Sequence, residues 1–355
     1  MTRPSAYILG PHSARRWAND FERGQASSRM PYGAETLSEA GYSVRYSEIE
    51  GVPWAPLHHL SRASVSRGGP SLGGVLALLQ ARRSELFVSL FEDNALSLQR
   101  PLACRALRPA VSIVICCWLA QSWPLLSDGD RRALRRSLAA FDHIVVFSTN
   151  QVACLRGALE DSGSKLHVVP FGVNVGSFPP REQSTASHGL SVGSDGGRDF
   201  PTLAAAARLA NVQVRVATAP AMLEGVDTQR LEPLGLLSLD AYRRELEQAS
   251  FVVIATHAPA YPSGQTVLLE AMATGRACVM TDSPAIRDYV TDEHDVLLVE
   301  PHDEAALSRA MRRLADDPAL RGRLGIAARH TVERRFSSSQ MWQKLASIAE
   351  GGRKR

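Results

Sequence analysis

The sequence predicts an α/β fold made of two doubly wound domains, each built on a parallel sheet. The chain has 355 residues, more than one hydrophobic core normally supports. Short apolar runs alternate with amphipathic segments rich in Ala and Leu from end to end, which is typical of parallel sheets with crossover helices. A stretch rich in Gly, Pro, Ser and Thr at 171–189 interrupts the alternation and is expected to link the domains.

The first half of the chain alternates between predicted strands and predicted helices. The strands are expected at 6–10, 42–48, 85–90, 111–116, 143–148 and 165–170. The helices are expected at 33–40, 71–82, 127–140 and 150–160. Gly41 follows the first of these helices, as a helix-ending glycine should. The longest apolar run, AVSIVICCWLA, has about half of the ~20 residues that a membrane helix needs, so a buried strand is predicted there.

The alternation starts again after the linker. Strands are expected at 189–193, 212–218, 251–256, 277–281 and 295–300. Helices are expected at 199–210, 239–249, 265–274, 284–290, 303–315, 318–334 and 338–350. Ligands of doubly wound sheets bind beyond the carboxyl ends of the strands, so the loops after these ends are where a site is expected.

Composition and charge exclude several classes of protein. Apolar residues make up 45% and charged residues 21% of the chain, as in an ordinary globular protein. The net charge of +4 permits at most peripheral membrane contact, and no basic and aromatic pattern predicts nucleic-acid binding. The five cysteines have no repeated metal-ligand spacing, so neither a disulfide frame nor a zinc site is expected. Reduced thiols and no secretory signal predict a cytoplasmic protein.

The stretch YPSGQTVLLEAMATGRACV at 261–279 has the features of an anion site. Ser263 is a good N-cap, and Gly264 lets a ligand approach the backbone closely. A helix that begins at Gln265 and Thr266 would point unpaired amide N–H groups at a phosphate. Glu270 lies one turn further among apolar residues, where its carboxylate could accept two hydrogen bonds from a ribose diol. The alternative is that it pairs with an arginine across the domain.

The residues SGQTVLLEAMATGRACVMTD resemble the nucleotide-sugar site of retaining GT-B glycosyltransferases, whose motif is Glu, seven residues, a second Glu, then Ala-Met-Ala-x-Gly. Glu270 stands at the second Glu, which holds ribose in the family. Pro262 replaces the first, which usually contacts the donor sugar. The resemblance implies two Rossmann-like domains facing a central cleft. These are an acceptor-side domain at 1–177, a donor-binding domain at 178–335, and a C-terminal helix at 336–355 that returns to the first domain.

Further landmarks resemble the same family. SVGSDGGRDFPTL at 191–203 is similar to the first strand and glycine loop of the donor domain, with Gly193 at the turn. Ser194 occupies a position where the family has an arginine for the diphosphate, which leaves Arg198 as the expected phosphate cation and a catalytic residue. Leu236 and Leu237 are expected to form the wall of the nucleotide base site.

The acceptor side is less defined in the sequence. The family usually places a histidine after the fourth or fifth strand, and this chain has Cys117 and Trp118 there. Cys117 is expected to be a small core residue and not a nucleophile. Trp118 is expected to face the acceptor.

Several polar residues follow predicted strands and compete for the acceptor-side chemistry. His12 follows the first strand and is a candidate catalytic residue that touches acceptor or donor. His257, after the strand at 251–256, has a similar claim. Glu92 or Asp93 would orient an acceptor hydroxyl or amine as a base. The sequence does not choose among these residues.

The resemblance implies transfer of a sugar from a nucleotide-diphosphate sugar to a small-molecule or glycan acceptor with retention. In such enzymes the leaving diphosphate takes the acceptor proton, while helix N–H groups and a cation stabilise its charge. No cofactor or metal is expected, because the chain lacks a DxD motif of the metal-dependent type. Two alternatives stay open. Pro262 and Cys117 suggest a nucleotide-binding pseudoenzyme or partner subunit, and the same fold also supports epimerases and phosphorylases. The oligomeric state is not predicted.

Overall fold

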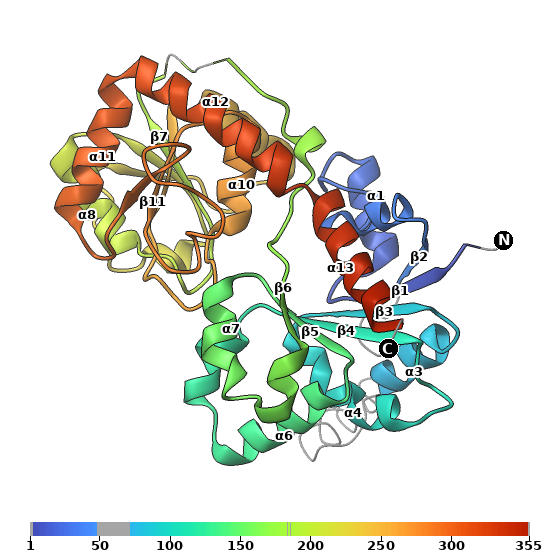
Figure 1. Cartoon of the computed structure of the whole chain (residues 1–355). Helices are drawn as coiled ribbons and strands as arrows, with labels where there is room; N and C mark the ends of the chain where they lie inside the picture. Colours follow the sequence, from blue (N-terminus) through green and yellow to red (C-terminus); the bar gives the residue numbers. More distant parts are fainter. Residues whose placement is uncertain (1–2, 48–71, 183, 185, 354–355) are drawn as a thin grey trace. The chain divides into compact units, whose positions relative to one another are not determined.

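The chain folds into two compact units (Figure 1), seen in a computed structural model that describes residues 3–47, 72–182, 184 and 186–353. The first unit comprises Met1–Pro170 and Ser339–Arg355, and the second comprises Phe171–Ser338. The observed division therefore precedes the expected boundary at 177/178 by seven residues, because the Phe171 N–H donates to the Tyr289 hydroxyl at 2.9 Å within the second unit. Residues 48–71, 183 and 185, which include parts of the predicted strand 42–48, helix 71–82 and linker, lie outside the described residues.

The first unit is built on a parallel sheet of six strands in the order β2-β1-β3-β4-β5-β6. The strands are β1 (Ser5–Leu9), β2 (Ser43–Tyr46), β3 (Leu86–Leu90), β4 (Val111–Cys116), β5 (His143–Val146) and β6 (Leu166–Val168). Each overlaps a strand predicted from the sequence. Every residue of β3 and β4 is buried, as continuous apolar runs covered on both faces require.

Helices connect these strands. They are α1 (Ala14–Glu22), η1 (Pro31–Ser38), α3 (Leu72–Ala81), η2 (Glu92–Asn94), α4 (Ala95–Ala103), α5 (Leu119–Ser122), η3 (Trp123–Leu125), α6 (Asp128–Ala139), α7 (Thr149–Arg156), η4 (Glu160–Lys165) and the C-terminal α13 (Ser338–Arg353). Two predictions need correction here. The segment predicted as a helix at 33–40 is a 3-10 turn, because Tyr32 and Gly33 have positive φ, and the helix predicted to reach residue 160 ends at Arg156.

The C-terminal helix α13 packs within the first unit. The side chain of Trp342 is fully buried and its indole N–H donates to the carbonyl of Tyr32 at 2.9 Å. Trp342 therefore attaches the C-terminal helix to η1.

The second unit has a parallel sheet in the order β12-β11-β10-β7-β8-β9. Its strands are β7 (Gly189–Val192), β8 (Val214–Ala217), β9 (Leu231–Pro233), β10 (Phe251–Ile254), β11 (Cys278–Thr281) and β12 (Leu297–Val299). Strand β9 was not predicted, because it has three residues, two of them exposed, and ends in a proline that only a sheet edge tolerates. The strand order reverses between β7 and β10, which is where ligands bind in such sheets.

The helices of this unit are η5 (Val175–Ser177), α8 (Phe200–Ala210), η6 (Pro220–Leu223), α9 (Leu239–Gln248), α10 (Gln265–Ala273), α11 (Glu304–Asp316) and α12 (Pro318–Arg335). Helices α8 and α11 lie side by side on one face of the sheet (Figure 1), over a core that includes Leu203, Val253 and Met311. The predicted helix at 284–290 was wrong, since this segment forms only successive turns. The predicted helix at 338–350 is the C-terminal α13 of the first unit.

Candidate functional site

Helix α10 begins at the carboxyl edge of the second sheet with free backbone donors. Gly264, with φ +81°, is the N-cap, so the cap lies one residue beyond the predicted Ser263. The Gln265 N–H bonds the Pro262 carbonyl at 3.2 Å. Within the described part of the chain, the N–H groups of Thr266 and Val267 have no acceptor. These two donors and the helix dipole make this end attractive to an anion.

The Ser263 side chain does not cap α10, because it bonds a carboxylate and not the backbone N–H groups of the helix. Its hydroxyl donates to Oδ1 of Asp195 at 2.7 Å, and the same oxygen accepts from the Tyr261 hydroxyl at 3.0 Å and the Gly197 N–H at 2.9 Å. Burial raises the pKa of Asp195, but these hydrogen bonds and the Arg198 charge outweigh it and lower the pKa overall. Asp195 therefore joins the glycine loop to the start of α10. Asp195 was not among the residues predicted from the sequence, although it directly precedes Gly196, Gly197 and Arg198.

Arg198 lies beneath this junction and is only 5% exposed. Its guanidinium donates to the Val192 carbonyl and lies 3.2 Å from Oδ2 of Asp195. Gly193 has φ +137°, and a methyl group there would overlap the guanidinium, so the position requires glycine. A methyl group at Gly264 would lie 3.2 Å from Nη1 of Arg198. The cation is thus enclosed between the glycine loop and the helix start, and a direct bond from it to phosphate stays a prediction.

Glu270 lies on the second turn of α10 and is partly buried. Its Oε2 accepts a hydrogen bond from the Tyr242 hydroxyl at 2.9 Å. Burial raises the pKa of Glu270 to about 7, against the lowering effects of this bond and of the Arg243 charge. No ion pair to Glu270 is found among the described residues, but the Arg243 charge acts on it, so the arginine alternative stays open. Its ribose role stays a prediction.

The remaining donor-side residues differ in exposure. Gln265 is 8% exposed, and its side-chain oxygen has no hydrogen-bond partner in the described part of the chain. Thr266 is exposed. Leu236 and Leu237 follow β9, and Leu236 is 74% exposed. Leu236 thus offers unpaired apolar surface beyond a strand end, as a base wall would.

Three further side chains meet at the same edge of the second sheet. Asp199 follows β7, His257 follows β10 and His302 follows β12, and their ligand atoms all lie within 4.8 Å of one another. From the sequence, only His257 is a candidate site residue, and no metal site is expected. No motif in the sequence indicates Asp199 or His302, because about 60 residues separate Asp199 from His257 and about 45 separate His257 from His302.

The carboxyl edge of the first sheet carries the predicted acceptor-side residues. The buried carboxylate of Glu92 accepts the N–H groups of Cys117 at 2.9 Å and Trp118 at 2.7 Å. Burial raises the pKa of Glu92, and the backbone hydrogen bonds oppose that rise. Glu92 therefore holds the loop after β4, and both of its oxygens are engaged by the backbone. Cys117 is 6% exposed, in agreement with a core position.

Aromatic rings connect His12 to Trp118 along this edge. His12 contacts Tyr32 with ring centroids 5.8 Å apart, Tyr32 contacts Phe91 at 5.7 Å, and Phe91 contacts Trp118 at 5.1 Å. Trp118 is 41% exposed. Burial and the Arg16 charge lower the pKa of His12, which lines a cavity of about 320 Å³. The sequence analysis missed Tyr32 and Phe91, which no motif distinguishes.

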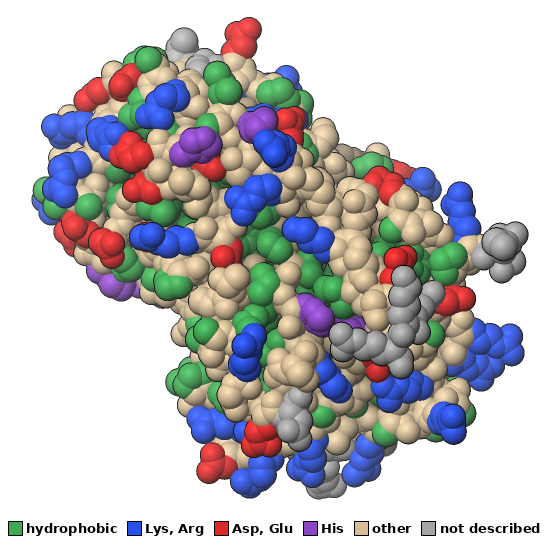
Figure 2. Space-filling model, in the orientation of Figure 1, with side chains coloured by type: hydrophobic (Ala, Val, Ile, Leu, Met, Phe, Trp, Pro, Cys, Tyr) green, Lys and Arg blue, Asp and Glu red, His purple; other side chains and the backbone are tan. Residues whose placement is uncertain are grey.

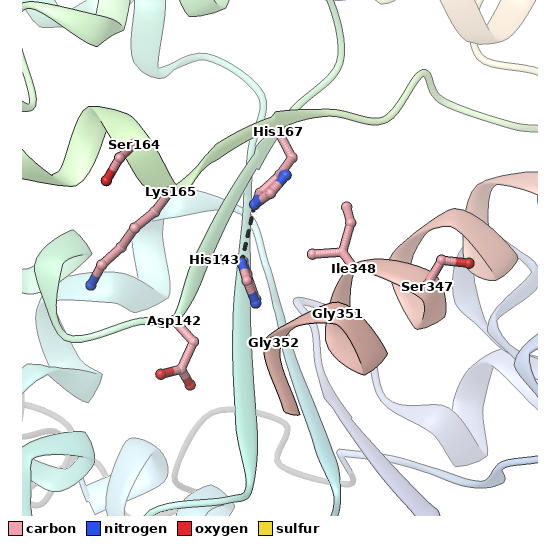
Figure 3. Close-up of a pocket in the computed structure, with 9 residues that line it drawn as sticks. All are labelled: Asp142, His143, Ser164, Lys165, His167, Ser347, Ile348, Gly351 and Gly352. Atoms are coloured by element: carbon pink, nitrogen blue, oxygen red, sulfur yellow. Dashed lines mark hydrogen bonds between the residues drawn. The ribbon is translucent and has the colours of Figure 1, made fainter. Parts of the chain in front are cut away.

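Another cavity of the first unit, of about 440 Å³, lies away from these residues. Figure 3 shows that His143 and His167 extend from neighbouring strands into it, with Nδ1 of His143 and Nε2 of His167 3.0 Å apart. Asp142 and Lys165 also line it, near the amino ends of β5 and β6. Since ligands of parallel sheets bind at the carboxyl ends, this cavity is not the expected substrate site.

The surface in Figure 2 shows basic and acidic side chains interspersed over the second unit, as the small net charge leads one to expect. Among the described residues, none of the helices combines the length and apolar character that crossing a bilayer requires.

Residues 198–317 match a family model described as "Glycosyl transferases group 1". A 103-residue segment is 30% identical to the lipopolysaccharide core biosynthesis glycosyltransferase LpsD of Rhizobium meliloti (strain 1021), and it spans 29% of this chain and 29% of that relative's length. The matched family segment contains Arg198, Glu270 and the start of α10. Both matches support a glycosyltransferase.

Solved structures share the fold over nearly the whole chain. Sucrose-phosphate synthase from Thermosynechococcus elongatus matches with a TM-score of 0.70 at 16% identity, covering 98% of each chain. Anabaena HepE in complex with UDP and glucose matches with a TM-score of 0.66 at 13% identity, covering 98% of this chain and 99% of that one. The two Rossmann-like parallel-sheet units thus match the GT-B fold of these structures, and the predicted fold class is confirmed.

Proposed function

We propose that the protein is a retaining glycosyltransferase that takes a sugar from a nucleotide-diphosphate donor. The observation that carries the proposal is the start of α10. It presents the N–H groups of Thr266 and Val267 without acceptors, one turn before the carboxylate of Glu270. This arrangement lies inside the segment that matches the group 1 glycosyltransferase family.

Each part of a nucleoside diphosphate has a candidate partner in the second unit. The diphosphate would accept the N–H groups of Thr266 and Val267, and the ribose hydroxyls would donate to Glu270. A rise of 1.5 Å per residue puts Glu270 about 6 Å further along the helix axis than Thr266. The base would lie on the exposed Leu236 and on Leu237. UDP is the first donor nucleotide to test, because the HepE structure contains it.

The transfer step needs charge stabilisation more than it needs a protein nucleophile. The bond from the anomeric carbon to the diphosphate oxygen breaks, the acceptor oxygen bonds the same face of that carbon, and its proton goes to the leaving diphosphate. The negative charge that grows on the diphosphate is stabilised by the helix N–H groups. Arg198, enclosed directly behind Gly264, adds a positive charge that its ion pair with Asp195 partly offsets. This step requires neither a cofactor nor a divalent ion.

The row of contacting rings formed by His12, Tyr32, Phe91 and Trp118 favours a saccharide acceptor over an apolar one. Rings exposed on one side stack against the C–H face of a sugar ring, and Trp118 is 41% exposed. His12 would act at this acceptor. Glu92 is a weaker base candidate than the sequence suggests, since backbone N–H groups engage both of its oxygens.

A second candidate function is nucleotide binding without sugar transfer. Pro262 stands where the resembling family has a carboxylate for the donor sugar, and it lies directly before the start of α10. Such a protein would bind the nucleoside diphosphate and leave the sugar unreacted.

A two-step experiment separates these functions. UDP, GDP, ADP and dTDP are first screened for thermal stabilisation, because a bound nucleotide raises the melting temperature by mass action. The sugar nucleotides of the stabilising base are then incubated with saccharide acceptors, and the product anomer is read by NMR. Transfer with retention is the expected result. Binding without turnover supports the second candidate, and no stabilisation by any nucleotide contradicts both.

A further inference from the structure

The group formed by Asp199, His257 and His302 has the composition of a metal site. Oδ2 of Asp199 lies 2.9 Å from Nδ1 of His302 and 3.5 Å from Nδ1 of His257. The two imidazole rings are 5.3 Å apart between centroids and tilted by 31°. One carboxylate oxygen thus faces two imidazole nitrogens.

These separations fit ligands of one ion. Zinc binds imidazole nitrogen at about 2.0–2.1 Å and carboxylate oxygen at about 2.0–2.2 Å. Two ligands at such lengths and at angles of 90–110° lie about 2.8–3.5 Å apart. The two observed oxygen–nitrogen separations, 2.9 and 3.5 Å, fall within that range. The imidazole nitrogens of His257 and His302 lie within 4.8 Å of each other, so binding an ion requires side-chain movements that bring these two nitrogens to ligand distance.

The surroundings of Asp199 orient it as a ligand. Its side chain is 2% exposed, and both of its oxygens are held by Thr202, whose N–H donates to Oδ1 at 3.0 Å and whose hydroxyl donates to Oδ2 at 2.7 Å. Such bonds from a neighbouring residue are the usual support of a metal-binding carboxylate.

The two histidines leave the site open to solvent. Their side chains are 46% exposed for His257 and 59% exposed for His302, so an ion has an entry path and water can fill the remaining coordination positions. A backbone hydrogen bond holds His257, whose N–H donates to the Gly197 carbonyl at 2.9 Å. His302 has a positive φ of +60°.

We propose that Asp199, His257 and His302 bind one divalent transition-metal ion of the zinc class. Two imidazoles and one carboxylate favour such an ion over Mg²⁺ or Ca²⁺, which prefer oxygen ligands. The ion would connect the loops after β7, β10 and β12 beside the glycine loop. It has no part in the transfer step proposed above, so the two proposals are independent.

The test is cobalt binding to the full chain after dialysis against a chelator. Co²⁺ is titrated at constant pH, and its visible absorption and the heat of binding give the stoichiometry and the affinity. Wild type is expected to bind one ion per chain at micromolar concentration. His302→Gly, which suits a positive φ and so preserves the backbone, is expected to weaken binding at least tenfold. His257→Ala is expected to do the same.

The matched control is His294→Ala. His294 is an exposed histidine with Nδ1 3.8 Å from Oδ2 of Asp295, a similar pair without a second imidazole. Its substitution is expected to leave cobalt affinity unchanged. Wild-type binding weaker than millimolar, or equal binding by His302→Gly and wild type, would show that Asp199 and the histidines form only a hydrogen-bonded structural contact. Melting temperatures without metal establish that each variant is folded.

Discussion

The hydroxyl of Tyr242 donates a 2.9 Å hydrogen bond to Oε2 of Glu270, the carboxylate one turn inside the helix that begins at the candidate anion site. Burial raises the pKa of this carboxyl to about 7, even though the bond opposes the rise. Near neutral pH, Glu270 is therefore divided between a protonated form and a carboxylate. Only the carboxylate can accept two hydrogen bonds from a ribose diol.

Nucleotide affinity should therefore rise with pH. A diol that binds only the carboxylate must displace a proton below pH 7, so affinity is expected to increase about tenfold from pH 6 to pH 8. Calorimetric titration of UDP at pH 6, 7 and 8 measures this. The Glu270→Gln variant is expected to lack this tenfold increase in affinity. Any change in affinity with pH that remains in the variant comes from titration of the nucleotide itself, and dividing the wild-type change by it isolates the effect of Glu270. Equal slopes in both proteins would show that Glu270 does not contact the nucleotide.

The same group affects stability with a defined sign. The unfolded chain releases the Glu270 proton near its ordinary pKa of 4.5 and the folded chain near 7, so the folded state binds more protons between these values. Stability therefore falls as pH rises through this window. The free energy of unfolding of Glu270→Gln, relative to that of the wild type, is therefore expected to rise by roughly 1–3 kcal/mol from pH 5 to pH 8, allowing for partial burial. Urea unfolding of both proteins at pH 5 and pH 8 tests this. A stability difference between them that is the same at both pH values would show that the pKa of Glu270 is not raised in the folded protein.

Gly193→Ala should disrupt the anion site. The new methyl group would overlap the Arg198 guanidinium at a backbone φ of +137°, so we expect a loss of about 1–3 kcal/mol in stability and at least tenfold weaker nucleotide binding. Gly196→Ala is the matched control in the same loop, since a methyl group there meets no atom within 4 Å. Chemical unfolding and calorimetry compare the two. Similar behaviour of both variants would contradict the packing role of Gly193.

Trp118→Ala should affect the acceptor and not the donor. Removing an exposed stacking ring is expected to raise the acceptor KM about tenfold while the donor KM stays within twofold, because Trp118 belongs to the first unit and the candidate nucleotide residues to the second. Initial rates with each substrate varied in turn give both constants. Leu125→Ala, at an 83% exposed side chain nearby in sequence, is the control. A donor KM raised as much as the acceptor KM would contradict the assignment of Trp118 to the acceptor.

The sequence predicted most of the architecture because parallel strands are buried on both faces and read as continuous apolar runs, such as 111–116. It did not predict α1, which has no buried residue, or α4, which contains Pro101. In α1 the apolar residues Trp17, Ala18 and Phe21 do recur at helical spacing, but they lie within a short, mostly polar segment; in α4 a proline interrupts the pattern.

The candidate site could be predicted only where its residues are adjacent in sequence. Gly264 and Glu270 lie on one helix, so the stretch itself indicates the anion site. Tyr242 lies 28 residues from Glu270 and Asp195 lies 68 from Ser263, and only the sheet brings these pairs together. The setting of Arg198 was also beyond the sequence, because its enclosure depends on Gly193, Asp195 and the start of α10 at once.

Nucleotide affinity of the Glu270→Ala variant tests the central claim most directly. With the nucleoside diphosphate that stabilises wild type, loss of a charge-assisted contact of about 1.5–3 kcal/mol predicts ten- to hundredfold weaker binding. Glu304→Ala, at an exposed position in the first turn of α11, should bind like wild type. Unchanged affinity in a folded Glu270→Ala variant would contradict the assignment of ribose to this carboxylate, and with it the proposed donor site.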